Sequence, residues 1–109
     1  ITAIGNDYGF EQIFSRQLDA LGEKGDLLII ISTSGNSKNL INAVKTSKLK
    51  GIRSIGFLGK DGGILKNLCE QSFIVPSNNT PRIQETHIEL IHIICELVEM
   101  QLFEPDQII

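Results

Sequence analysis

The feature that most constrains the fold is a run of five aliphatic residues, 27–31, that leads directly into the segment STSGNS at residues 32–37. A continuous, partly β-branched apolar run bounded by polar residues predicts a buried strand, at residues 26–32. Apolar side chains then recur at helical spacing over residues 36–50, and Gly51 is a candidate C-cap. The polar turn therefore faces the first unpaired N–H groups of a helix, a position that favours an anion, commonly phosphate.

Two more strands are predicted at residues 53–58 and 72–75, and helical patterns separate the three strands. One helical pattern precedes the first strand at residues 12–21, and a short one around Leu65 follows the turn at residues 59–63. Connections of helix length between strands imply a parallel sheet with right-handed crossovers. The sequence thus predicts an α/β fold.

Each predicted strand ends in a loop of small polar residues, at positions 32–37, 59–63 and 77–80. Ligands of open parallel sheets bind at the carboxyl ends of the strands. We therefore expect the three loops to line one pocket. A polar turn is also predicted at residues 5–10, before the first helix, and its position allows Asn6 and Asp7 to contact a polyol, although both residue types are common in turns.

The first of these loops is the strongest candidate for binding chemistry. Ser34 or Asn36 alone would be explained as a helix N-cap, which these residue types favour. Four hydroxyl side chains within six positions exceed what a cap needs. We therefore predict that the phosphate ligands are Ser32, Thr33, Ser34 and Ser37.

The last predicted helix, residues 81–102, is apolar around most of its circumference. Such a helix is buried on several sides, which one small domain can hardly provide. A partner subunit would bury it, so the sequence predicts a homo-oligomer. The tail at residues 104–109 contains Pro105 and is expected to be a frayed end.

Two residues of this helix, Gln84 and His92, are candidates for acting together at one site. A lone histidine such as His92 on an apolar helix is more often a core residue, but Gln84 lies two turns earlier along the same drifting stripe. The two are ~12 Å apart along the helix axis, so they meet at one metal only if both reach toward a point between them. His87 points to a different side and is expected to be structural.

Composition excludes several classes of function. The chain has 109 residues and a net charge of −3, which indicates a single domain without a basic surface for nucleic acid. No apolar run is long enough for a membrane span. Cys69 and Cys95 lie in apolar helical patterns without metal-binding spacing, so we expect buried, reduced thiols in a cytoplasmic protein.

Four segments together resemble the SIS (sugar isomerase) domain family, and within it the sedoheptulose 7-phosphate isomerases. They are residues 32–37 (STSGNS), 6–10 (NDYGF), 59–63 (GKDGG) and 82–87 (RIQETH). The resemblance covers residues 1–102. It implies a three-layer αβα sandwich with a Rossmann-like parallel sheet, in which residues 1–103 form part of an SIS domain and residues 104–109 a C-terminal tail.

The activity that the resemblance implies is aldose–ketose isomerisation of sedoheptulose 7-phosphate to D-glycero-D-manno-heptose 7-phosphate, a precursor for lipopolysaccharide or capsule. It also implies a homotetramer and a bound zinc ion. The implied roles are phosphate binding by Ser32, Thr33, Ser34 and Ser37, substrate contacts by Asn6, Asp7 and Gln84, zinc ligation by Gln84 and His92, and proton transfer through an enediol by His92.

The resemblance also implies an earlier half that precedes these residues in the family, with a glycine-rich loop, a histidine and a catalytic glutamate. We therefore expect the sequence to be the C-terminal part of an isomerase subunit, inactive as this fragment alone. Two alternatives stay open. One is a non-catalytic SIS module that binds a sugar phosphate or associates with a replication initiator, and the other is an isomerase of hexose or pentose phosphates.

Overall fold

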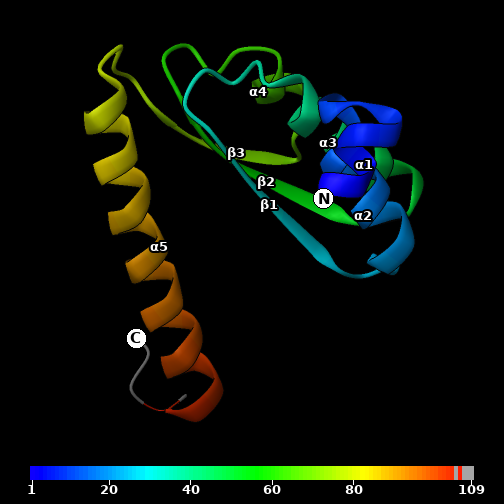
Figure 1. Ribbon diagram of the computed structural model, residues 1–109. Helices are drawn as coiled ribbons and strands as arrows, with labels where there is room; N and C mark the ends of the chain where they lie inside the picture. Colours follow the sequence, from blue (N-terminus) through cyan, green and yellow to red (C-terminus); the bar gives the residue numbers. More distant parts are fainter. Residues whose placement is uncertain (105, 107–109) are drawn as a thin grey trace.

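The computed structural model of the chain describes residues 1–104 and 106 and confirms an α/β fold (Figure 1). Its three strands are β1 (Leu27–Ser32), β2 (Arg53–Gly59) and β3 (Gln71–Val75). They form a parallel sheet in the order β1-β2-β3. Helices precede, connect and follow the strands, in the order α1 (Thr2–Tyr8), the 3-10 helix η1 (Phe10–Gln12), α2 (Ile13–Leu21), α3 (Lys38–Leu49), α4 (Leu65–Leu68) and α5 (Thr80–Phe103).

One face of the sheet carries the main core. Ile30 of β1 and Leu58 of β2 pack against Val44 of α3, and Leu65 and Cys69 complete the cluster around α4. Helix α2 packs on α3, and the segment α1–η1 lies against these two helices. This arrangement follows from strand alternation, because every second side chain of β1 and β2 points to the same side.

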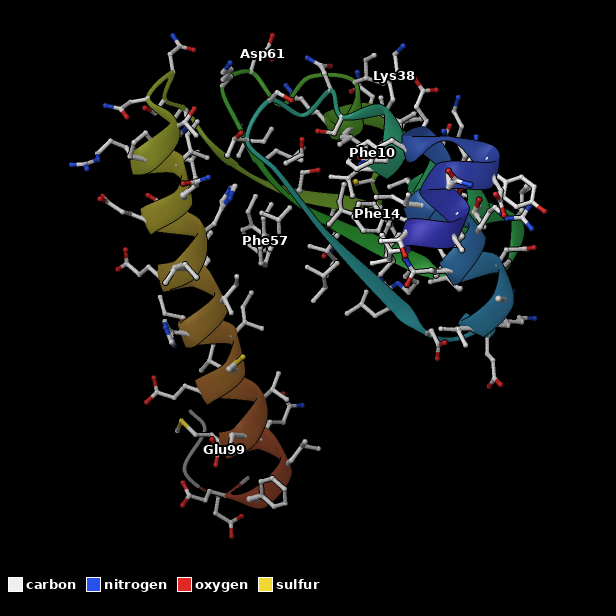
Figure 2. The ribbon with its side chains drawn as sticks, in the orientation of Figure 1. Phe10, Phe14, Lys38, Phe57, Asp61 and Glu99 are labelled. Carbon is white, nitrogen blue, oxygen red and sulfur yellow. The ribbon has the colours of Figure 1, made fainter. Side chains whose placement is uncertain are left out.

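Within the part of the chain that the structure describes, the opposite face of the sheet is covered by the beginning of α5. Phe57 of β2 packs edge-on against Phe73 of β3 and lies beside the ring of His87 on α5. Figure 2 shows Phe57 pointing into the space between the sheet and the helix. Beyond this contact α5 runs away from the sheet (Figure 1), and its residue Glu99 lies far from the strands (Figure 2). The helices therefore form layers on both sides of the sheet, but the α5 layer is incomplete.

An apolar groove follows the outer edge of β1. It has a volume of about 760 Å³ and lies between α2, β1 and α3, with Leu28, Ile30 and Leu40 in its lining and Ser37 at its polar end. On the other face of the same strand, Ile29 and Ile31 are about half exposed. A strand with apolar side chains on both faces is typical of the interior of a parallel sheet, yet here β1 is an edge strand.

Two local predictions are wrong. The predicted turn at residues 5–10 is helical up to Tyr8, because Gly9, at φ 95°, ends the helix only after Asn6 and Asp7. Cys95, predicted to be buried, is exposed, because it lies on the part of α5 that leaves the sheet, whereas Cys69 is buried as expected. Burial raises the pKa of the Cys69 thiol, against smaller lowering effects of Ser54 and Lys48.

The remaining elements agree with the predicted ones within a few residues, and α3 begins at Lys38 rather than at Asn36. Among the described residues, none of the helices combines the length and hydropathy that a bilayer-spanning segment needs. The predicted frayed tail lies for the most part outside the described residues, which exclude 105 and 107–109.

Candidate functional site

The first loop, residues 32–37, follows β1 and is braced by the hydroxyl of Ser32. This side chain is only 4% exposed, and its Oγ accepts the N–H of Gly35 at 3.1 Å. The same Oγ lies 3.2 Å from the Oγ of Ser37, so the two hydroxyls share a hydrogen bond across the loop. Ser32 therefore shapes the loop from inside, and its hydroxyl is already engaged there.

Thr33, Ser34 and Ser37 are half-buried and lie closer to the surface of this loop. The Oγ of Ser34 accepts the N–H of Asn36 at 3.1 Å, which makes a tight turn within the loop. Ser37, rather than Ser34 or Asn36, is the N-cap residue of α3, and its side chain forms no capping hydrogen bond in the described structure. The first N–H groups of α3 thus face a loop of small hydroxyl residues, which is the arrangement expected of an anion site.

The first loop is held against the second loop, residues 59–63, by a close backbone approach. Gly35 has φ 69°, and a Cβ at this position would lie 2.1 Å from the carbonyl oxygen of Gly62. The carbonyl oxygen of Gly35 in turn accepts the N–H of Leu65 at 3.0 Å. Only glycine has both the conformational freedom and the space that position 35 requires.

Asn36 makes the second link between these loops. Its Oδ1 accepts the N–H of Ile64 at 2.9 Å, across 28 positions of sequence. From the sequence, Asn36 is expected only as a possible helix cap, and no neighbouring residue in the chain indicates this contact. The glycines at 62 and 63 are a partial sequence signal of this contact. A side chain at position 63 would collide with Asn36, because a Cβ on Gly63 would lie 2.6 Å from this same Oδ1.

The third loop, residues 77–80, joins the other two through Lys60. The N–H of Lys60 donates to the carbonyl oxygen of Ser77 at 3.1 Å, and Lys60 has an unusual φ of 54° for a residue other than glycine. The three loops therefore lie together, and we call them the loop cluster, while the pocket expected between them stays a prediction. Figure 2 shows Asp61 of the second loop and Lys38 of the first turn of α3 at this same end of the sheet. The groove along β1 reaches this end of the sheet at Ser37.

Asn6 and Asp7 are both exposed on α1, and the amide of Asn6 donates to the carboxylate of Asp7 at 2.9 Å. Their segment is tied to the beginning of α3, because Lys38 pairs with Glu11 at 3.4 Å. The amide of Asn42 also donates to the Glu11 carbonyl at 3.0 Å. These bonds hold η1, which follows α1, beside α3, and within residues 1–104 no hydrogen bond or ion pair joins Asn6 or Asp7 to the loop itself.

Gln84 and His92 are exposed on α5, whereas His87 between them is buried. His87 was predicted to be structural, and its Nε2 lies 2.8 Å from the carbonyl oxygen of Leu58. Gln84 and His92 stand eight residues apart, ~12 Å along the axis of a single helix. Among the described residues, no side-chain hydrogen bond or ion pair joins Gln84 or His92 to the first or second loop, while Gln84 lies one helical turn after Thr80, the last residue of the third loop.

A zinc ion usually takes four ligands, and catalytic sites take three of them from the protein. Gln84 and His92 supply at most two, and the described residues contain no group of three or more His, Cys, Asp or Glu side chains able to hold a metal. These two residues therefore do not form a metal site by themselves. Further ligands would have to come from outside the described residues.

Comparison with known proteins identifies the class to which this fold and loop belong. The sequence profile of the SIS domain family matches residues 1–59, from α1 through the first loop to the end of β2. The chain is a member of the SIS domain family.

Within this family the chain is most informatively compared with phosphoheptose isomerases. It is 58% identical over 103 residues to the one from Trichlorobacter lovleyi and 59% identical over 103 residues to the one from Citrifermentans bemidjiense. These alignments cover 94% of this chain but 53% and 54% of the relatives, so the chain spans about half their length. The structure of phosphoheptose isomerase from Neisseria gonorrhoeae matches with a TM-score of 0.88 and 48% identity, covering 90% of this chain and 55% of that one.

Proposed function

We propose that this chain is part of a sugar-phosphate isomerase that converts sedoheptulose 7-phosphate to D-glycero-D-manno-heptose 7-phosphate, for lipopolysaccharide or capsule synthesis. The similarity to proteins named phosphoheptose isomerase, at 58% and 59% identity, supports the reaction class and the sugar. The solved structure with 48% identity supports a common arrangement of strands and loops.

The observation that carries the proposal is the loop cluster at the carboxyl ends of the strands. The first loop presents three half-buried hydroxyl residues, Thr33, Ser34 and Ser37, at an N-terminus of α3 without a side-chain cap. Such a site suits the phosphate end of a substrate, because backbone N–H groups and the helix dipole both favour a dianion. Ser32 contributes by holding the loop in shape through Gly35 and Ser37.

The reaction moves a proton between two neighbouring carbons of the sugar through an enediol. His92 is the group we assign to this transfer, because histidine is the side chain that most often serves as a general acid or base. A second acid–base group, a glutamate by family resemblance, would come from outside this chain, as would the elements that bring His92 to the substrate. If zinc is bound, Gln84 and His92 would supply two of its ligands, and the ion would polarise the substrate carbonyl.

We also propose a homotetramer in the cytoplasm. The half of α5 that leaves the sheet exposes Leu97, Val98 and Leu102 by half or more, and burial of these side chains requires another subunit or segment. The two free thiols, Cys69 and Cys95, suit a reducing compartment.

The direct test is conversion of sedoheptulose 7-phosphate, followed by the appearance of the aldose phosphate. The protein encoded by the complete gene should turn over the substrate, and the 109-residue chain should not. Thr33→Ala with Ser34→Ala should raise KM for the sugar phosphate without changing the fold. Absence of turnover by the protein encoded by the complete gene would refute the proposal.

The alternative is a non-catalytic SIS module that only binds a sugar phosphate. It is favoured by one observation, that the described residues leave His92 exposed and away from the loop cluster. Calorimetric titration with sedoheptulose 7-phosphate separates the two functions. Binding without turnover by the protein encoded by the complete gene would favour the module, whereas binding with turnover favours the isomerase.

A further inference from the structure

Helix α5 contacts the sheet through one buried side of its first turns, formed by Ile83 and His87. Ile83 is 0% exposed and His87 is 2% exposed. The Nε2 of His87 lies 2.8 Å from the carbonyl oxygen of Leu58, and its ring packs beside Phe57. This bond is the one hydrogen bond that the described side chains of α5 make with the sheet. The orientation of the helix therefore depends largely on the contacts of its first turns.

This contact lies directly beside the first loop. Leu58 pairs in register with Ser32, the first residue of that loop. A Cβ on the next residue, Gly59, would lie 2.6 Å from the carbonyl oxygen of Thr33 and 2.6 Å from Cδ1 of Ile83. Gly59 is thus enclosed between the first loop and α5. The end of β2 is the place where the position of α5 relative to the candidate phosphate site is set.

The hydrogen-bonding chemistry of His87 indicates that a contribution to folding stability does not by itself explain a histidine at this position. A carbonyl oxygen only accepts, so Nε2 carries the proton toward Leu58, and Nδ1 of the neutral ring is a bare acceptor. Nδ1 is buried and has no partner among the described residues. An unpaired buried acceptor costs free energy that an aliphatic side chain would not. What the imidazole adds at this position is the directional bond to Leu58.

We propose that His87 is a positioning residue that sets the rotation and tilt of α5, and with them the placement of Gln84 and His92. This inference rests on the proposed function, in which these two residues serve the isomerisation. Neighbouring helix positions differ by about 100° in direction, so rotation of α5 at the His87 contact would turn both side chains away. His92 lies ~7.5 Å beyond His87 along the axis, so a tilt there displaces it further than Gln84.

The kinetic test compares two variants in the protein encoded by the complete gene. His87→Gln retains a side-chain N–H with a reach similar to Nε2, whereas His87→Leu removes the donor but still fills the space. We expect His87→Leu to lower kcat by about tenfold or more, with a smaller rise in KM, because the first loop is intact and only the expected substrate contact of Gln84 is displaced. His87→Gln should recover most of kcat. Ile83→Val is the matched control, since it weakens packing on Gly59 but leaves the hydrogen bond.

The second test measures the position of α5 without reference to activity. Spin labels at Lys45 on α3 and Glu96 on α5, both exposed, report the distance between the helices by pulsed electron resonance. Cys95→Ser removes the exposed thiol, and excess unlabelled protein limits the signal to pairs within one subunit. The distance distribution should shift or broaden in His87→Leu and stay close to wild type in His87→Gln.

Three results would overturn the proposal. They are an unchanged distance distribution in His87→Leu, a loss of kcat that His87→Gln does not recover, and an equal loss of kcat in Ile83→Val. If the wild-type protein has no isomerase activity, the proposed function fails. A shifted distribution in His87→Leu would then still support the positioning of α5 by His87, and an unshifted one would still overturn it.

Discussion

The loop cluster and the outer half of α5 differ in what supports them. The first and second loops are joined by bonds within this chain, from Gly35 to Leu65 and from Asn36 to Ile64. Past His87, by contrast, α5 leaves the sheet and exposes a series of apolar side chains, which are Ile88, Ile93, Leu97, Val98, Leu102 and Phe103. The candidate anion site is therefore built from local turns and neighbouring strands, whereas the outer half of α5 has little support from the described residues.

This difference matters because substrate binding and catalysis have different physical requirements. An anion site requires backbone N–H groups in a fixed geometry, and one strand, one loop and one helix start can supply them. Proton transfer requires a side chain within hydrogen-bond distance of the reacting carbons, and a position on a distant helix is set only by packing. The following predictions, all for the protein encoded by the complete gene, test whether the two regions are as independent as this comparison indicates.

The largest effect is expected from Gly35→Ala. The added methyl group would lie 2.1 Å from the Gly62 carbonyl oxygen at a residue with φ 69°, so the two loops must separate. We expect a loss of more than about 3 kcal/mol in free energy of unfolding and loss of sugar-phosphate binding. Gly25→Ala is the matched control, since Gly25 has φ 94° but open space around it, and it should cost about 1 kcal/mol. Equal losses in urea denaturation would contradict the close approach of the loops.

His92→Ala should lower kcat by about 10²- to 10⁴-fold. Because His92 is exposed and distant from the loop cluster, the affinity for the sugar phosphate and the unfolding free energy should change little. Steady-state kinetics and calorimetric titration measure the two properties separately. Glu89→Gln, at another exposed position of α5, is the control and should leave kcat near wild type. Unchanged turnover in His92→Ala would remove this residue from the mechanism.

Leu97→Glu tests whether the outer half of α5 is covered by another subunit. Leu97 is 52% exposed in this chain, and a buried carboxylate at an interface would weaken association by about tenfold or more. Light scattering after size exclusion would show smaller oligomers. Leu49→Glu carries the same change on α3, where the side chain is 90% exposed, and should leave the oligomer intact. An unchanged mass in Leu97→Glu would show that this surface lies outside the interface.

Asn36→Ala removes the acceptor for the Ile64 N–H and should cost about 1–2 kcal/mol in unfolding free energy. The same change should weaken sugar-phosphate binding, since the first loop loses one of its links to the second. Asn42→Ala is matched to it, because Asn42 also bonds a backbone group, the carbonyl of Glu11, but outside the loops. A similar loss of affinity in both variants would mean that the link at Asn36 has no special role.

The smallest effect concerns the dependence of stability on pH. Burial raises the pKa of Cys69 above its ordinary value of 9.0, so the unfolded chain releases this proton at lower pH than the folded one. Below that ordinary pKa, the protonated thiol makes its full contribution to the free energy of unfolding. This contribution is lost as the pH rises through the pKa that Cys69 has in the folded state. The wild type should therefore lose slightly more unfolding free energy between pH 8 and 10 than Cys69→Ala. Cys95→Ala should follow the wild type, and an identical slope in Cys69→Ala would contradict the shift.

Much of the sheet could be predicted because its signals are local. Apolar runs bounded by glycine and polar residues predicted β1, β2 and β3 within one residue at each end. The contact between Asn36 and Ile64 could not be predicted, because it joins positions 28 residues apart. The helical state of Asn6 and Asp7 was also missed, since turn-forming residues in a short helix are held there by packing of α1 on its neighbours. The functional roles of Asn6, Asp7, Gln84 and the four hydroxyl residues of the first loop stay predictions.

The sequence by itself determined the order of strands and helices and the parallel sheet, and it predicts phosphate binding at residues 32–37. These properties depend on apolar periodicity and on small residues adjacent in the chain, so they are visible without tertiary contacts. Tertiary structure alone decided that Ser32 braces the loop from inside, that Gly35 must approach Gly62, and that His87 meets the carbonyl of Leu58. Each of these depends on which backbone groups remain unpaired once the chain has folded.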